Sequence, residues 1–215
     1  MHVALMIGML QGLGQTTAFF ELDIQFLAQR LPFVKWILPQ ARKQAVSYNA
    51  GERRPSWFNI WNLPPHVAEH DEAGIAESVS LIEQLILDEV HNGLDPRKIL
   101  LVGFSQGAAL CLMTALTTLH DIGGVGSLSG WIPHRIRDHI LQNDPNIPIF
   151  WAHGNADTEI PLRYGRNSIE FLEQRLCMTD DILCYIEYKG LGHEITDDVL
   201  VDLARWIAST LDSSL

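Results

Sequence analysis

Continuous apolar runs of five to eight residues alternate along the chain with longer amphipathic stretches. Runs that lack polar alternation predict strands with both faces covered, as in a parallel sheet. The predicted strands span residues 3–10, 34–38, 98–103, 124–128, 147–152 and 183–188.

The stretches between these runs carry apolar residues at helical spacing, and the predicted helices span residues 18–30, 72–91, 106–119, 162–176 and 197–210. In the second of them Ile75, Val79, Ile82 and Ile86 form one stripe. Strands that alternate with helices predict an α/β fold, with a mostly parallel central sheet and helices on both faces in a three-layer sandwich.

Residues 39–70 interrupt the alternation with four prolines and several aromatic residues. A long irregular segment in a compact protein is often functional, so we expect a substrate-side loop here. A surface loop held by buried tryptophans would have the same composition. No linker or repeat divides the chain, and its 215 residues predict a single domain over 1–215.

Charge excludes several classes of partner. With 15 basic and 26 acidic residues the net charge is 15 − 26 = −11, which disfavours nucleic acid and allows at most transient membrane contact. The apolar residues 1–10 lack the basic flank of a signal peptide and are too short to span a bilayer. Three irregularly spaced cysteines favour a reduced protein. We expect the protein in the cytoplasm, with the nucleus as an alternative or additional location.

Residues Gly103-Phe104-Ser105-Gln106-Gly107 match the G-x-S-x-G pattern. A β-type run precedes the motif and a helix-type run follows it, which is the strand–turn–helix context of a nucleophile elbow. The glycines leave room for the tight turn that holds the serine hydroxyl at the end of the sheet. Ser105 is therefore the predicted nucleophile, and the alternative is a glycine-rich βα turn with an incidental serine.

A serine nucleophile needs a base and an acid that orients the base. His193 follows the last predicted strand in a glycine-rich loop, and Asp157 follows the strand before it. The carboxyl ends of such strands gather catalytic groups, so we predict the order Ser105, Asp157, His193. His153 is the competing base, and Glu159 and Glu194 are alternative acids.

Two backbone N–H groups are the candidates for an oxyanion hole. One belongs to Gln106, directly after the nucleophile. The other belongs to Leu13 in the glycine-containing loop 11–15 after the first strand. As a dinucleotide site this loop lacks the third glycine.

Several segments resemble the acyl-protein thioesterase and lysophospholipase branch of the phospholipase/carboxylesterase family, whose members have the α/β-hydrolase fold. The similar segments run in order over nearly the whole chain. They are Gly12-Leu13-Gly14, Pro55-Ser56-Trp57-Phe58, Asp71-Glu72-Ala73-Gly74-Ile75, the GFSQG motif 103–107, Leu128-Ser129-Gly130-Trp131-Ile132-Pro133, the HGNAD motif 153–157 with Ile160-Pro161, and Gly192-His193.

The resemblance implies a palmitoyl-protein hydrolase type of serine esterase without cofactor or metal. Its substrates would be fatty-acyl thioesters on S-palmitoylated protein cysteines, and lysophospholipids or small carboxyl esters. It implies the same triad and a hydrophobic acyl groove built partly by the loop around Leu63, with Trp57, Leu63 and Trp131 as substrate contacts. A monomer or weak homodimer is expected.

The chain departs from the family pattern around the first loop. Gln11 and Gln15 replace the usual histidine and aspartate on either side of the GLG segment, and Asn59 replaces the aspartate after PSWF. These changes bear on the loop that carries the Leu13 N–H. They leave the three triad residues untouched.

Three other functions compete with this interpretation. A general carboxylesterase would lack protein substrates, and a non-catalytic relative would bind acyl chains or a partner protein. Residues 66–70 also fit the H-x-x-E-H pattern of some zinc peptidases, which would need a third ligand.

Overall fold

Six parallel strands form the central sheet, and a computed structural model describes residues 4–140 and 146–212 of the chain. Neighbouring strands follow the order β2-β1-β5-β6-β7-β8. Their bounds are β1 Ala4–Leu10, β2 Val34–Ile37, β5 Ile99–Phe104, β6 Gly124–Leu128, β7 Ile149–Gly154 and β8 Leu183–Tyr188. Since every pair is parallel, all carboxyl ends lie at one edge of the sheet.

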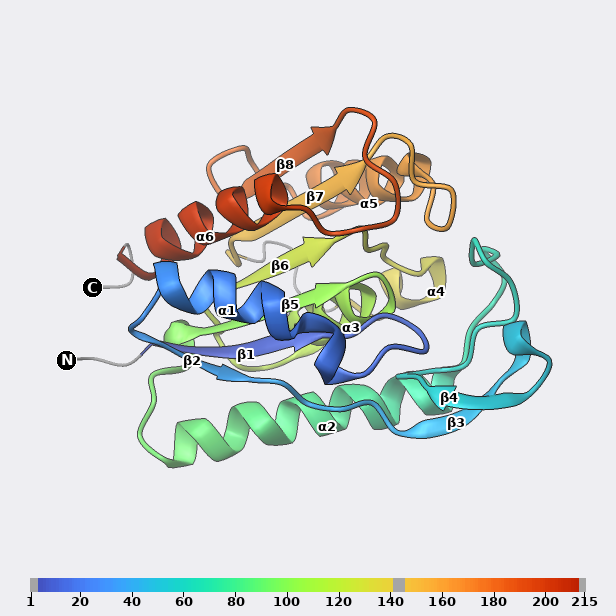
Figure 1. The fold of residues 1–215 in the computed structure, drawn as a ribbon, viewed down its shortest axis with the longest axis horizontal. Coiled ribbons are helices and arrows are strands. Elements are labelled where there is room, and N and C mark those ends of the chain that lie inside the picture. Colours follow the sequence, from blue (N-terminus) through green and yellow to red (C-terminus); the bar gives the residue numbers. More distant parts are fainter. Residues whose placement is uncertain (1–3, 141–145, 213–215) are drawn as a thin grey trace.

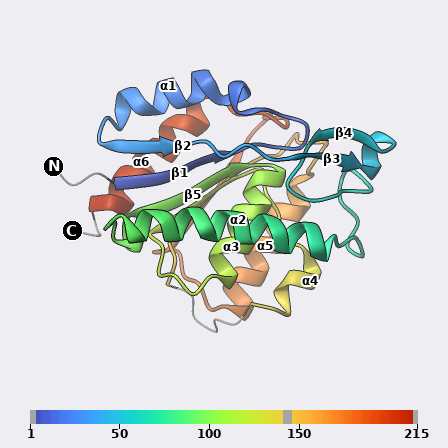
Figure 2. The same cartoon turned by 90° about the horizontal axis from the view of Figure 1, so that it is seen from below.

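Helices cover both faces of this sheet (Figures 1 and 2). One face carries α1 (Glu21–Arg30) and α6 (Asp197–Asp212), which contact each other. The other carries α2 (Glu72–His91), α3 (Gln106–Thr117), α5 (Leu162–Arg175) and the short α4 (His134–Arg137). Single 3₁₀ turns occupy Thr17–Phe20, Ser47–Asn49 and Pro96–Lys98.

The strands divide the apolar residues between two cores. Leu100 and Val102 of β5 pack into the core beneath α1 and α6. Their neighbours Ile99 and Leu101 pack into the core beneath α2, α3 and α5. This alternation is the period of two that a strand imposes on its side chains, and it explains why the runs read as continuously apolar.

The three-layer α/β prediction is confirmed. Both bounds of β6, β8 and α2 are the predicted ones, and the other predicted elements differ from the observed ones by at most three residues at either end. The first predicted strand, 3–10, begins at a residue outside those described. Within the described ranges, no helix combines the length and apolar character that crossing a bilayer requires.

The segment 39–70 is less irregular than its composition suggests. It contains a two-stranded antiparallel hairpin, β3 (Lys43–Val46) and β4 (Glu52–Pro55), which forms a sheet of its own. The part of the segment after β4 begins with the buried Ser56 and Trp57 and runs over the carboxyl edge of the main sheet (Figure 1). The expected irregular loop is therefore partly a β-hairpin, and this part of the prediction is corrected.

Candidate active site

Ser105 sits in the tight turn between β5 and α3 with φ 54° and ψ −119°, a backbone conformation that is strained for any residue other than glycine. The flanking glycines allow this turn. A Cβ on Gly103 would overlap the backbone of Gly107, and a Cβ on Gly107 would overlap the carbonyl oxygen of Leu10. The Ser105 N–H donates to the Leu128 carbonyl (2.8 Å), which fastens the turn to β6.

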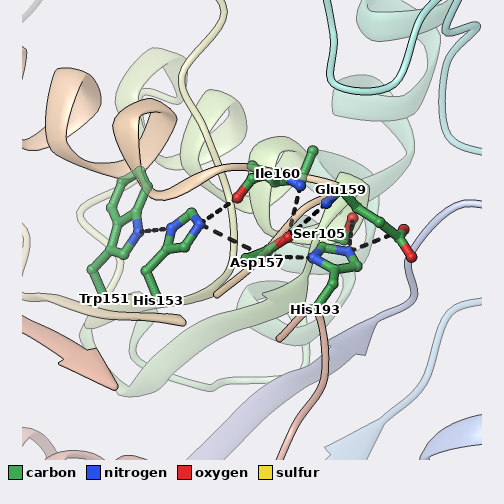
Figure 3. Close-up of polar contacts among 7 residues, drawn as sticks. All are labelled: Ser105, Trp151, His153, Asp157, Glu159, Ile160 and His193. Atoms are coloured by element: carbon green, nitrogen blue, oxygen red, sulfur yellow. Dashed lines mark hydrogen bonds and ion pairs between the residues drawn. The ribbon is translucent and has the colours of Figure 1, made fainter. Parts of the chain in front are cut away.

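Three predicted side chains meet at the carboxyl edge of the sheet (Figure 3). The His193 Nε2 lies 2.9 Å from the Ser105 Oγ, and the Nδ1 of the same ring lies 2.7 Å from the Asp157 Oδ2. Because a carboxylate accepts hydrogen bonds, Nδ1 carries the proton and Nε2 is left to accept the serine hydroxyl. This is the arrangement that activates a serine for nucleophilic attack.

Backbone hydrogen bonds join the two loops that carry Asp157 and His193. The Asn155 N–H donates to the Tyr188 carbonyl (3.0 Å) and the Ala156 N–H to the Leu191 carbonyl (2.9 Å). The His193 ring also packs against Phe104, with ring centroids 4.7 Å apart. The loops after β7 and β8 thus hold the Asp157 carboxylate and the His193 imidazole next to each other.

The Asp157 carboxylate is buried and fully engaged. Its Oδ1 accepts the N–H groups of Glu159 (2.9 Å) and Ile160 (2.8 Å), while Oδ2 faces His193. Burial alone would raise the pKa of Asp157, but the hydrogen bond and charge of His193 and the Ile160 N–H outweigh it and lower the pKa. The acid therefore stays ionised beside the imidazole.

His153, the competing base, lies behind the triad. It is fully buried, and within the described residues it forms no hydrogen bond with Ser105. The Trp151 indole N–H donates to its Nδ1 (3.5 Å), and its Nε2 lies 2.7 Å from the Ile160 carbonyl. Burial lowers the pKa of His153 despite the opposing effects of that carbonyl and of Asp157. A neutral His153 holds the 157–160 turn in place.

Both candidate oxyanion donors are available. Within the described residues, no acceptor takes the N–H of Leu13 or of Gln106, which is the first residue of α3. The loop around Leu13 is fixed on both sides, because the Gly12 N–H donates to the Gln15 Oε1 (2.9 Å) and the Gly14 N–H to the Pro55 carbonyl (2.8 Å). Gln15 thus stabilises the loop in which it departs from the family pattern.

The buried side chain of Gln106 connects the elbow with the segment after β4. Its Oε1 accepts the Trp57 N–H (3.0 Å) and its Nε2 donates to the Phe58 carbonyl (2.7 Å). The Trp57 indole N–H in turn donates to the Gln11 carbonyl (2.9 Å), directly before the first loop. One chain of hydrogen bonds therefore links the two segments that carry the candidate oxyanion donors.

A pocket opens over Ser105. Its lining residues come from the first loop, the hairpin, the loop after β4 and the loops after β5 to β8: Gly12, Leu13, Gln15, Tyr48, Asn49, Arg54, Ile60, Leu63, Phe104, Ser105, Trp131, Glu159 and His193. Leu63 and Trp131 were expected to contact substrate, and both line the pocket. Trp57 does not: it is 1% exposed and packs in the core, so that expectation is corrected.

Two charged residues line this pocket; Arg54 was not expected there, and Glu159 was expected only as an alternative acid. Arg54 comes from β4, and its guanidinium pairs with Glu52 (2.7 Å). Glu159 lies in the turn after Asp157, and its Oε2 is 3.8 Å from the His193 Nε2. Neither position carries a local sequence signal, because a charged residue in a hairpin or a turn is ordinarily solvated.

The geometry favours neither the alternative acids nor a zinc-peptidase site at residues 66–70. Glu159 faces Nε2 rather than Nδ1, and within the described part of the chain the exposed Glu194 forms no hydrogen bond with His193. The Glu69 carboxylate accepts the N–H groups of Trp61, Asn62 and His66 and so fastens its loop. Across residues 4–140 and 146–212 no group of three His, Cys, Asp or Glu residues could hold a metal ion.

Comparison with known proteins agrees with the fold and the site. The chain matches the phospholipase/carboxylesterase family model over residues 2–211. The chain belongs to this family. It is thus a serine hydrolase related to the carboxylesterases and acyl-protein thioesterases, as the sequence motifs implied.

Individual relatives are similar over nearly the full length. The chain is 37% identical to acyl-protein thioesterase 1 of Yarrowia lipolytica, covering 98% of this chain and 93% of the relative. It is 33% identical to a probable SOBER1-like carboxylesterase of Arabidopsis thaliana, covering 95% and 78%. The crystal structure of Arabidopsis thaliana SOBER1 superposes with a TM-score of 0.85 at 31% identity, covering 96% and 98%.

Proposed function

We propose that the protein hydrolyses fatty-acyl thioesters of S-acylated protein cysteines, together with lysophospholipid or small carboxyl esters, through an acyl-enzyme on Ser105. The observation that carries the proposal is the continuous relay from the Asp157 Oδ2 through both ring nitrogens of His193 to the Ser105 Oγ. The similarity to acyl-protein thioesterase 1 of Yarrowia lipolytica supports the substrate class.

Acylation begins when the His193 Nε2 takes the hydroxyl proton of Ser105 and the Oγ attacks the acyl carbonyl. The N–H groups of Leu13 and Gln106 then donate to the negative oxygen of the tetrahedral intermediate. Collapse breaks the bond to the leaving sulfur or oxygen, which receives the proton from Nε2. Asp157 stabilises the imidazolium that exists between the two proton transfers.

Deacylation repeats these steps with water. The same Nε2 removes a proton from a water molecule that attacks the acyl-enzyme, and the second collapse returns the proton to the Ser105 Oγ. The fatty acid leaves, and the side chains recover their starting protonation states. These residues complete the cycle without a cofactor.

Covalent labelling tests the catalytic part of the proposal. A fluorophosphonate probe should add to the wild-type protein at a single serine that peptide mapping assigns to Ser105, and Ser105→Ala should remain unlabelled while keeping the wild-type circular dichroism spectrum. Absence of labelling in the wild-type protein would contradict serine hydrolysis and favour a non-catalytic binding role.

Matched substrates test the thioester part. An S-palmitoyl cysteine peptide, its O-palmitoyl serine counterpart and a short-chain aryl ester should all be cleaved by the wild type and not by Ser105→Ala. The similarity to a probable carboxylesterase makes a general esterase the second candidate function. Cleavage of the aryl ester without cleavage of either peptide would favour that candidate.

A further inference from the structure

The carboxylate of Glu159 lies beside the nitrogen that moves the proton. Its Oε2 is 3.8 Å from the His193 Nε2, on the same side of the ring as the Ser105 Oγ (Figure 3). The Glu159 main-chain N–H donates to the Asp157 Oδ1 (2.9 Å), so the backbone of Glu159 is held in place by the catalytic aspartate. The side chain itself is 55% exposed and lines the pocket over Ser105.

This position assigns Glu159 to the leaving-group side of the pocket. Nε2 must donate its proton to the departing sulfur or oxygen, which therefore comes within hydrogen-bond reach of Nε2, roughly 3 Å away. Since the Glu159 carboxylate is a near neighbour of the same nitrogen, substituents on the leaving atom pass close to its negative charge. The acyl chain, attached to the other side of the carbonyl, does not have to approach it.

The negative charge of Glu159 is not balanced by a permanent cation. Within residues 4–140 and 146–212, no Lys or Arg side chain forms an ion pair with it, and the one basic side chain within 4.0 Å is the imidazole of His193. Among the described residues that line the pocket, Arg54 is the one with a permanent positive charge. Its guanidinium already pairs with Glu52 through both Nε (3.0 Å) and Nη2 (2.7 Å). The net charge of −11 adds to the negative potential at the pocket.

We propose that Glu159 is a specificity-determining residue that selects leaving groups with a positive charge close to the leaving atom. For thioester substrates this means acylated cysteines with Lys or Arg as immediate neighbours in the peptide. This inference rests on the proposed function, because it names the substrate class of the same site. Anionic leaving groups are repelled by the same carboxylate.

Three S-acyl peptides test the selection. They carry the same acyl chain on a central cysteine that is flanked on both sides by Lys, Gln or Glu. At low salt, kcat/KM of the wild type should be about tenfold higher for the Lys peptide than for the Glu peptide, since attraction and repulsion each change the rate a few-fold for a partly exposed charge. The Gln peptide should fall between them, and 0.5 M salt should reduce the difference.

Variants at two glutamates complete the test. Glu159→Gln should bring the Lys and Glu peptides within about twofold of each other, and Glu159→Lys should reverse the order. Glu194→Gln is the matched control, because it removes the same charge from an exposed neighbour of His193 outside the pocket. It should keep the wild-type preference. An equal preference in wild type and Glu159→Gln would overturn the proposal.

A parallel oxoester series separates this proposal from the thioesterase proposal. Aryl esters of one short acyl chain, with a trimethylammonium, neutral or sulfonate group on the phenol, present the same three charges without a peptide. Should the peptides resist cleavage while the aryl esters are hydrolysed, the thioesterase proposal fails and the selection by Glu159 is decided on the esters. A wild-type enzyme that treats all three esters alike would overturn the selection.

Discussion

The Nδ1 of His193 and the Oδ2 of Asp157 lie 2.7 Å apart, although 36 positions separate the two residues in the sequence. The contact exists because β7 and β8 are parallel neighbours, so that the loops after them meet at one edge of the sheet. The other carboxylate oxygen, Oδ1, is held by two backbone N–H groups. The carboxylate can therefore not rotate without losing these bonds, and it fixes the ring orientation of His193.

Asp157→Asn should abolish most of the catalytic activity without unfolding the protein. The asparagine oxygen replaces Oδ1 as the acceptor for Glu159 and Ile160, which turns its NH₂ group toward the His193 Nδ1. His193 must then carry its proton on Nε2, where it can no longer accept from Ser105. We expect kcat to fall by about 10⁴-fold, measured by ester hydrolysis at neutral pH.

Glu194→Gln again serves as the control for loss of a nearby carboxylate, and it should retain activity within a few-fold. A loss of less than tenfold in Asp157→Asn would contradict the role of Asp157. It would indicate that another acid orients the imidazole.

The buried His153 should make stability depend on pH below neutrality. Its pKa in the folded protein is lowered by burial, so it lies below the ordinary value of about 6.5. Below that pH the unfolded chain binds a proton that the folded protein does not, and the free energy of unfolding falls as the pH drops toward the folded pKa. Above the ordinary value this contribution is fully retained.

Urea denaturation between pH 7.5 and 5 measures this effect. The wild type should lose up to about 1.4 kcal/mol per pH unit more than His153→Gln below pH 6.5, because glutamine can still donate to the Ile160 carbonyl but does not titrate. The exposed His139→Gln should follow the wild type. Parallel curves for wild type and His153→Gln would show that His153 is not the titrating group.

Local signals explain which parts of the fold were predictable. The start of α2 was predicted correctly because its cap is local: the Asp71 side chain accepts the Gly74 N–H (3.1 Å). The β3–β4 hairpin was missed because its strands have four residues each and carry charged side chains such as Lys43 and Arg53. Such strands show neither a buried run nor a clear alternation.

The same distinction applies to the site. Ser105 has an elbow motif, and Asp157 and His193 each follow a predicted strand, so their positions were predictable from nearby residues. An aromatic residue in a loop has no such signal. Trp57 and Trp131 look alike in sequence and are both buried in the same core, but only Trp131 also lines the pocket over Ser105, while the Trp57 indole N–H donates to the Gln11 carbonyl. Burial of this kind depends on distant segments.

Gln15 should act as a positioning residue for the first loop. Its Oε1 accepts the Gly12 N–H and holds the backbone next to Leu13. Gln15→Ala removes this acceptor, and we expect kcat to fall about tenfold with little change in KM, since loss of a whole oxyanion donor costs 10²–10³-fold. Gln15→Glu keeps an acceptor oxygen and should recover most of the activity. A larger change in KM than in kcat would instead assign Gln15 to substrate binding.

Ile60 should limit the length of the acyl chain. It is buried and lines the pocket over Ser105 together with Trp131. Both residues also line a second, neighbouring hollow, whose walls include Phe58, Val67 and Tyr164. Because the two spaces share these two side chains, shortening Ile60 should join them into one longer groove.

Ile60→Ala should therefore raise kcat/KM for a palmitoyl ester relative to a butyryl ester by about tenfold, the effect of burying about two more methylene groups at ~0.8 kcal/mol each. The substitution should also lower the free energy of unfolding by about 2–5 kcal/mol.

Ile75→Ala is the matched control, since Ile75 lines only the second hollow and is buried to a similar extent. It should destabilise the protein comparably but leave the ratio of the two esters near its wild-type value. If both variants changed that ratio equally, general loosening of the core, rather than the wall at Ile60, would account for the chain-length preference.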